Sequence, residues 1–256
     1  MIGTFFLYAG TFSASLLTFF SGFGLGTLIL PFLALFVPVE QAIVYTAVIH
    51  LLNNVLKTAL FWKSIEGAKV LIFGGPAILG SLVGALLLTL ISKWNVEYSI
   101  HLLGIVLTIS PIKAVIGTLL FFIGLNELFR LFEVRFEGKG ALAAGGLLSG
   151  FFGGLAGLQG AFRSYFLVKS TDDKEVFLGT SAAVATLVDL SRLIVYSGMI
   201  GGVSLLIGHG VGIIVAALAG ILVGKFLLPK VQMGMIHTLI SFLLIAFGIL
   251  FAIGVI

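Results

Sequence analysis

Two hydrophobic segments, one in each half of the sequence, carry polar side chains that share one helical face. The first holds His50, Asn54 and Lys57, four and seven positions apart, and the second holds Asp189 and Arg192, three apart. An ionised side chain at the centre of a bilayer costs about 2.5–3.5 kcal/mol on insertion scales. We therefore expect these side chains to face a partner or a watery cavity, where they could bind an anion or carry a proton.

Glycines interrupt two apolar stretches, and further polar residues stand beside the second interruption. A half-helix that begins at such a break presents free N–H groups and the positive end of its dipole to an anion. Arg163 can bind an oxyanion through two hydrogen bonds, and Gln159 offers a donor and an acceptor. The predicted substrate-binding residues are Gly22, Gly24, Gly26, Asn54, Lys57, Gly157, Gln159, Gly160, Arg163 and Arg192, and the candidates for a coupling role are His50 and Asp189.

Each of these residues also has a structural interpretation. Lys57 could extend its amine to the membrane interface, and Asp189 and Arg192 could simply neutralise each other. His50 could be a hydrogen-bonded interior histidine, and Asn54 could hold two helices together. The glycines could serve only to let helices pack closely.

The composition is that of a membrane protein. Of the 256 residues, 60% are apolar and 9% are charged, against about 25% charged in soluble domains. The absence of cysteine excludes disulfides, iron–sulfur clusters and zinc thiolate sites, and we expect neither metal nor cofactor. Paired carboxylates, HExxH and GxSxG are missing from the apolar segments, so an enzyme is not expected. Anionic lipid accounts for the net charge of +4 without nucleic acid.

The hydrophobic segments predict an all-α polytopic protein with about eight transmembrane helices. The first 39 residues hold no charge, and as one straight helix they would exceed the bilayer, so the helix must break at its glycines and at Pro31. The later segments are 41–62, 70–92, 98–131, 140–168, 176–199, 203–228 and 231–256. Within 98–131 we favour a span over Ile112–Leu131, preceded by a short interfacial or re-entrant piece.

The sequence contains an internal repeat. A polar linker over 132–139 separates a first half, 1–131, from a second, 140–256. A shift of 135 residues places Asn54 on Asp189 and Lys57 on Arg192, although two apolar sequences always align to some degree. Each half then has a glycine-broken first helix and four spans. With four spans in each half, the halves are parallel. They become inverted if the short segment around His101 crosses the membrane or if a broken helix is re-entrant. Basic residues are balanced between the two sides of the membrane, so they leave the orientation open.

Repeated halves with interrupted helices are typical of secondary transporters. The glycine-rich segments GFGLGTLILP at 22–31 and SGFFGGLAGLQGAFRSYFL at 149–167 resemble those of the TauE/SafE sulfite exporter family, and the resemblance extends over the whole chain in length and span order. It implies an integral membrane permease for small sulfur-containing anions such as sulfite or organosulfonates, in a cell membrane and, for a bacterium, the inner membrane.

Alternating access around a site between the halves is the favoured mechanism. A passive anion channel, and a permease of the same fold for a carboxylate or another small solute, remain as alternatives. The expected partners are the anionic substrate and membrane lipid, with a homodimer left open.

Overall fold

The computed structural model is a helical bundle, and its described residues include a β-hairpin. It describes residues 2–21, 26–94, 96–102, 105–129, 138–168, 170–171, 173–199, 209–227 and 233–256. The helices are α1 (Ile2–Ser21), α2 (Gly26–Leu33), α3 (Val39–Leu60), α4 (Gly67–Lys69), α5 (Gly75–Ser92), α6 (Pro111–Phe129), α7 (Lys139–Ala156), α8 (Gln159–Val168), α9 (Lys174–Tyr196), α11 (Gly210–Leu227) and α12 (Met233–Ala252). The short turns are the 3₁₀ segments η1 (Trp62–Ser64) and η3 (Ser197–Met199) and the π-helical segment η2 (Val70–Gly74), and the strands are β1 (Tyr98–Leu102) and β2 (Ile105–Ile109).

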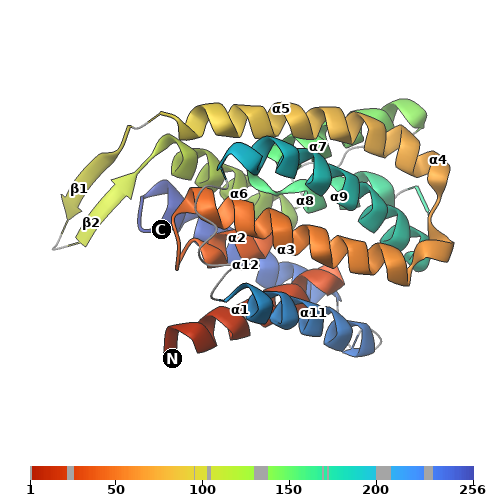
Figure 1. Cartoon of the computed structure of the whole chain (residues 1–256), viewed down its shortest axis with the longest axis horizontal. Helices are drawn as coiled ribbons and strands as arrows, with labels where there is room; N and C mark the ends of the chain where they lie inside the picture. Colours follow the sequence, from red (N-terminus) through yellow and green to blue (C-terminus); the bar gives the residue numbers. More distant parts are fainter. Residues whose placement is uncertain are drawn as a thin grey trace.

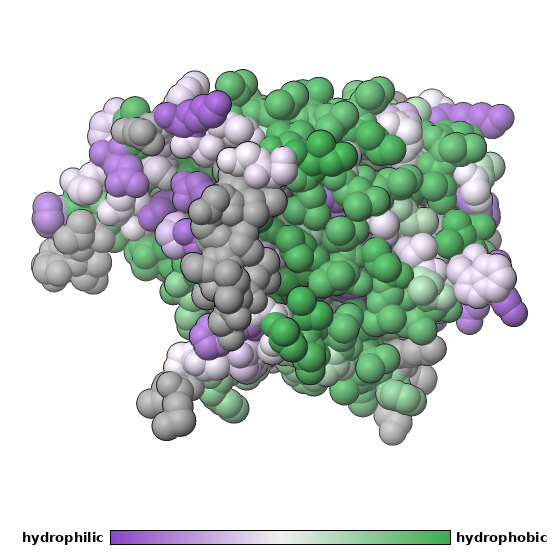
Figure 2. Space-filling view, in the orientation of Figure 1, coloured by the Kyte–Doolittle hydropathy of each residue, from purple (hydrophilic) through white to green (hydrophobic). Residues whose placement is uncertain are grey.

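The long helices lie roughly along the long axis of the molecule. Exposed large hydrophobic side chains stand on α1, α3, α5, α6, α7, α9, α11 and α12, and we call this apolar zone the apolar belt. Both termini lie at the end that carries the β-hairpin (Figure 1). Hydrophobic residues cover the middle of the molecule, and hydrophilic residues gather at its two ends (Figure 2). Among the described residues, five helical segments are long and apolar enough to cross a membrane: 39–60, 67–92, 111–129, 174–196 and 235–252. The expected number of eight spans and the division into half-repeats stay predictions.

The segment expected to be interfacial or re-entrant forms the β-hairpin. The antiparallel strands pair from Tyr98 with Ile109 to Leu102 with Ile105. The amide of Thr108 donates to the Gly254 carbonyl at 2.9 Å, which ties the hairpin to the end of the chain. The following helix α6 matches the expected span to within two residues at each end. Most of the expected linker, 132–137, lies outside the described residues.

The helices on either side of each glycine-rich break run antiparallel, whereas we expected a bent or broken span. A Cβ atom added at Gly10 of α1 would lie 1.9 Å from the ring of Phe32, which directly follows Pro31 in α2. A Cβ added at Gly145 of α7 would lie 2.4 Å from the ring of Phe166 in α8. These contacts require α1 to run antiparallel to α2, and α7 antiparallel to α8. Each pair is therefore a helical hairpin.

A local signal in the sequence produces the second reversal. Gly157 ends α7 in the left-handed region, with φ of 73°, which glycine adopts without strain. Its amide donates to the Gly153 carbonyl at 2.9 Å, and the Leu158 amide donates to the Phe152 carbonyl at 3.2 Å. A left-handed C′ glycine whose amide bonds the carbonyl four residues earlier is the αL motif, which terminates helices and redirects the chain.

Helix α7 packs closely along α5, and both run in the same direction. A Cβ at Gly150 would lie 1.9 Å from the Ala77 carbonyl oxygen, and one at Gly154 would lie 2.0 Å from that of Ser81. Only glycine permits this separation of the two backbones. Such small-residue crossings are the usual way in which helices pack inside a bilayer.

Helix α1 packs along α11 in the same manner. The Ser15 hydroxyl donates to the Ala217 carbonyl at 2.6 Å. A Cβ at Gly220 would lie 2.6 Å from the Phe12 carbonyl oxygen, and one at Gly224 would lie 2.9 Å from the Phe19 ring. Residue numbers rise together along both helices, so this pair is parallel too.

The other two principal pairs are antiparallel. In the α3–α9 pair, His50 contacts Asp189 while Phe61 lies against Gly179, so residue numbers rise in one helix as they fall in the other. In the α6–α12 pair the close contacts are Gly117 with Gly248 and Gly124 with Ser241.

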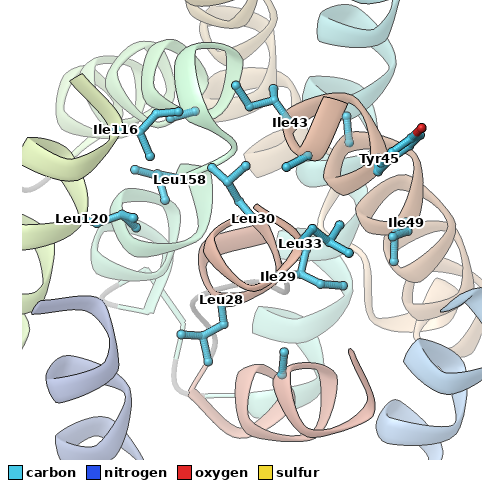
Figure 3. Packing of buried hydrophobic residues seen from close by; sticks show 14 of the residues in the cluster. Leu28, Ile29, Leu30, Leu33, Ile43, Tyr45, Ile49, Ile116, Leu120 and Leu158 are labelled. Carbon is cyan, nitrogen blue, oxygen red and sulfur yellow. The ribbon is translucent and has the colours of Figure 1, made fainter. Parts of the chain in front are cut away.

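Helix α2 occupies the centre of the molecule. Every residue of this helix except Phe32 is buried, and the helix is apolar all round, which is typical of a helix without an exposed face. It packs among side chains of α3, α6 and the α7–α8 turn (Figure 3). The labelled residues are Leu28, Ile29, Leu30, Leu33, Ile43, Tyr45, Ile49, Ile116, Leu120 and Leu158. This packing fixes the start of α2 beside the tip of the second hairpin, because a Cβ at Gly26 would lie 2.7 Å from the Gly157 carbonyl oxygen.

Candidate functional site

Polar side chains from α3, α8 and α9 meet inside the apolar belt and form a buried cluster. Each is at most 9% exposed. Its members are His50, Asn53, Asn54, Lys57, Gln159, Arg163, Ser181, Asp189, Arg192 and Tyr196. The second helical hairpin supplies Gln159 and Arg163, which explains why its reversal matters for the site: without it, α8 would not reach α3 and α9.

The carboxylate of Asp189 is the centre of the hydrogen-bond network. One oxygen, Oδ2, lies 2.7 Å from His50 Nδ1 and accepts from the Asn54 amide at 2.9 Å. The other, Oδ1, accepts from the Gln159 amide at 2.8 Å and from Arg192 Nε at 3.0 Å. Four partners on three helices thus satisfy one buried carboxylate, as a buried ion requires.

Arg192 is paired with Asp189, as the structural interpretation of the sequence anticipated. Its Nη2 lies 2.8 Å from Asp189 Oδ1, though no described residue accepts a hydrogen bond from it. Its Nη1 donates to the Gly153 carbonyl at 3.4 Å, and the neighbouring Tyr196 hydroxyl donates to the Gly154 carbonyl. Arg192 and Tyr196 therefore bind the end of α7 to α9.

Arg163 and Lys57 have no such counter-ion among the described residues. Arg163 donates from Nε to Ser181 Oγ at 2.7 Å and from Nη1 to Gln159 Oε1 at 3.1 Å. The Lys57 amine lies 5.2 Å from the centre of the Phe19 ring. Among the described carboxylates, none lies within 4.0 Å of either cation. The cluster therefore carries positive charge in excess of the single Asp189.

Both cations line one small pocket, which we call the cation pocket. Its walls are Phe19, Asn54, Lys57, Arg163, Phe177, Leu178, Ser181 and Ala182. The space of about 20 Å³ is room for roughly one water molecule. The hydroxyl, amide, amine and guanidinium groups around it are hydrogen-bond donors, so the pocket is suited to an anion that separates its walls.

A second group of predicted residues meets at the tip of the α7–α8 hairpin. Gly26 and Gly157 lie in backbone contact, and Arg192 Nη1 would be 2.9 Å from a Cβ added at Gly157. The buried hydroxyl of Thr46 lies nearby without a hydrogen-bond partner among the described residues. Gly160 is buried in the first turn of α8. The predicted Gly22 and Gly24 lie outside the described residues.

The sequence prediction missed Ser181 and Thr46. Both stand on the stripes that were identified: Thr46 is four residues before His50, and Ser181 is eight before Asp189. They are also equivalent under the shift of 135 residues. Extending each stripe by one or two helical turns would have found them.

Comparison with known proteins assigns the chain to a family. No curated protein and no solved structure matches it. The family model of the sulfite exporter TauE/SafE matches residues 7–251, nearly the whole chain and every helix of the buried cluster. The protein therefore belongs to the TauE/SafE sulfite exporter family.

Proposed function

We propose that this protein is a secondary transporter of small anions, and that the cation pocket binds the anion during transport. Family membership and the long apolar helices make the chain a multi-pass membrane protein of a transport family. The observation that carries the proposal is the pair of buried cations, Arg163 and Lys57, which line one pocket whose described walls hold no carboxylate.

The energetics of buried charge support an anionic substrate. Placing two cations in the apolar belt without counter-ions is unfavourable by several kcal/mol, since each alone costs about 2.5–3.5 kcal/mol on insertion scales. A bound anion supplies the missing charge. The arginine presents a planar fork that matches two oxygens of an oxyanion, and Ser181 and Asn54 offer further polar contacts. These features suit sulfite or an organosulfonate, and a carboxylate shares part of the same chemistry.

The packing of the helices supports two inverted half-repeats. The repeat makes α1 equivalent to α7, α3 to α9, α5 to α11, and α6 to α12. When each helix is replaced by its equivalent, the α1–α11 pair becomes α7–α5, and the α3–α9 and α6–α12 pairs are each exchanged within themselves, so the same four pairs result. The hairpin contact of Gly10 with Phe32 has its counterpart in Gly145 with Phe166. The α3–α9 and α6–α12 pairs join equivalent helices and are antiparallel, which a two-fold axis lying across the helices produces. In this arrangement the first expected span, with α1 and α2, and the fifth, with α7 and α8, become re-entrant hairpins that enter the membrane from opposite sides. The other six expected segments cross the membrane.

This arrangement supports alternating access. Anion sites in transporters with inverted repeats lie near the midplane, where interrupted helices meet. Here α2 begins and α7 ends beside each other, through Gly26 and Gly157, and α8 carries Arg163. The cation pocket is too small for a sulfur oxyanion, so its walls must separate to admit one. A carrier that opens to one side at a time meets this need, and we propose that it works in a bacterial inner membrane.

The test is transport into proteoliposomes that contain the purified protein. Sulfite, an organosulfonate and a carboxylate are each supplied to the wild type and to Arg163→Gln, Lys57→Gln and Lys63→Gln. The last is a matched control, because Lys63 is exposed in η1. We expect saturable uptake of one anion by the wild type and the control, and a loss of at least about tenfold in the other two variants, equivalent to 1.4 kcal/mol.

Two results would count against the proposal. If the folded proteins take up none of the three anions, anion transport is refuted. Equal uptake by Arg163→Gln and the wild type would remove the cation pocket from the mechanism. Flux that does not saturate would instead favour the passive channel.

A further inference from the structure

His50 holds one proton toward Asp189 and leaves its second ring nitrogen without one. The 2.7 Å distance between His50 Nδ1 and Asp189 Oδ2 is too short for two bare acceptors, so a proton lies between them. Asp189 is ionised because it also pairs with Arg192, and the hydrogen therefore belongs to Nδ1. In the neutral ring Nε2 then carries a lone pair and can bind a proton.

No strong hydrogen-bond donor among the described residues occupies the lone pair of His50 Nε2. Among the described residues its polar contact is the Asn54 amide nitrogen, at 3.4 Å, and this amide donates at a shorter distance, 2.9 Å, to Asp189. The imidazole is 1% exposed. Nε2 is thus a basic atom inside the apolar belt, and the described residues offer it neither a strong donor nor an acceptor to hold its proton.

The charges around His50 decide when a proton can bind. Helix α9 contributes Asp189, Arg192 and the Tyr196 hydroxyl, α8 contributes Arg163, and α3 contributes Lys57. Helix α2 and the described side chains of α11 contribute no titratable group. With three cations against one carboxylate, a further positive charge on His50 is opposed. An anion in the cation pocket offsets this repulsion.

The anion and the proton would bind side by side. Asn54 lines the cation pocket and also bonds the carboxylate that holds His50. Gln159 joins the two sites directly, because it accepts from Arg163 and donates to Asp189. We propose that His50 Nε2 takes up one proton when an anion enters the cation pocket, so that anion and proton move together as a symport. The inference rests on the proposed function, since it requires the anion site.

The experiment measures proton uptake during anion binding. Methanesulfonate and thiosulfate serve as probes, because neither changes its own charge near neutral pH. Each is added to purified protein in detergent, in weakly buffered solution with a pH indicator, and anion binding is measured in parallel. We expect the wild type to take up as much as one proton per bound anion. We also expect its affinity for the anion to rise about tenfold for each unit by which the pH falls, at pH values above those at which His50 titrates in the free protein.

Variants assign the proton to one histidine. In His50→Gln we expect anion binding with no proton uptake and an affinity that does not change with pH. His101→Gln is the control, since His101 is exposed in β1, and it should behave as the wild type does. The wild-type stoichiometry is informative even where His50→Gln does not fold.

The outcomes separate the two proposals. If the folded wild type binds neither probe, the proposed function fails, and the coupling fails with it. If it binds a probe without proton uptake, or releases protons, the anion site stands and the symport inference is overturned. Proton uptake that persists in folded His50→Gln would assign the proton to another group and would also overturn it.

Discussion

Replacing Asp189 by asparagine tests whether the buried cluster depends on its single carboxylate. The substitution keeps the size of the side chain and removes the charge that lies 2.8 Å from Arg192 Nη2. At an effective dielectric constant near 20, a charge pair at that separation attracts by about 6 kcal/mol. The asparagine oxygen still accepts hydrogen bonds, which recovers part of this. We therefore expect the variant to lose about 3–5 kcal/mol of stability, as for other broken buried pairs.

Thermal unfolding in a mild detergent gives the readout. A loss of this size lowers Tm by roughly 6–20 °C in a chain of about this length. Glu175→Gln is the matched control, because it makes the same change on an exposed residue of the same helix. An acidic residue at a helix N-terminus contributes up to about 1 kcal/mol, so we expect this change to lower Tm by at most about 4 °C. The double variant Asp189→Asn, Arg192→Gln should be more stable than the sum of the two single changes predicts. Wild-type stability in Asp189→Asn would refute the reasoning, because Arg192 would then need no counter-ion.

Three further predictions concern packing, orientation and hydrogen bonding. Gly150→Ala should lower the free energy of unfolding by about 1–3 kcal/mol by forcing α5 and α7 apart, whereas Gly75→Ala, where a Cβ meets open space, should not; thermal unfolding of both variants distinguishes them. Ser181→Ala should weaken anion binding about threefold to thirtyfold by removing the acceptor that orients the pocket arginine, with exposed Ser197→Ala as the control; equal affinities in equilibrium binding would contradict this. Tyr196→Phe should cost about 1 kcal/mol in the same unfolding assay by removing the bond to an α7 carbonyl, and no loss would show that the bond is not needed.

Much of the buried cluster could be predicted because helical spacing is a local property. The four- and seven-residue intervals placed His50, Asn54 and Lys57 on one face, and the structure buries all three together. The cost of charge in a bilayer predicted that they face partners. Which cation pairs with a carboxylate is a property of three-dimensional packing. Sequence alone could therefore group Arg192 with the substrate ligands or pair it with Asp189; the structure shows the pair, and a role of Arg192 in binding substrate stays a prediction.

The direction of the chain after each break could not be predicted. Glycine signals that a helix is interrupted, but the same residue permits a kink, a close crossing or a reversal. The reversal at Gly157 depends on a left-handed conformation and on contacts of Gly145 with Phe166, which lie 21 residues apart. The β-hairpin at 98–109 was missed for a related reason: its apolar residues suit a membrane interface as well as a strand.

Equilibrium binding of radiolabelled sulfite and of a radiolabelled sulfonate to the purified protein tests the central claim most directly. The claim is that Arg163 and Lys57 form the anion site. The account predicts saturable binding by the wild type and by the exposed control Lys63→Gln, and at least about tenfold weaker binding by folded Arg163→Gln. Binding by Arg163→Gln with wild-type affinity would contradict the account.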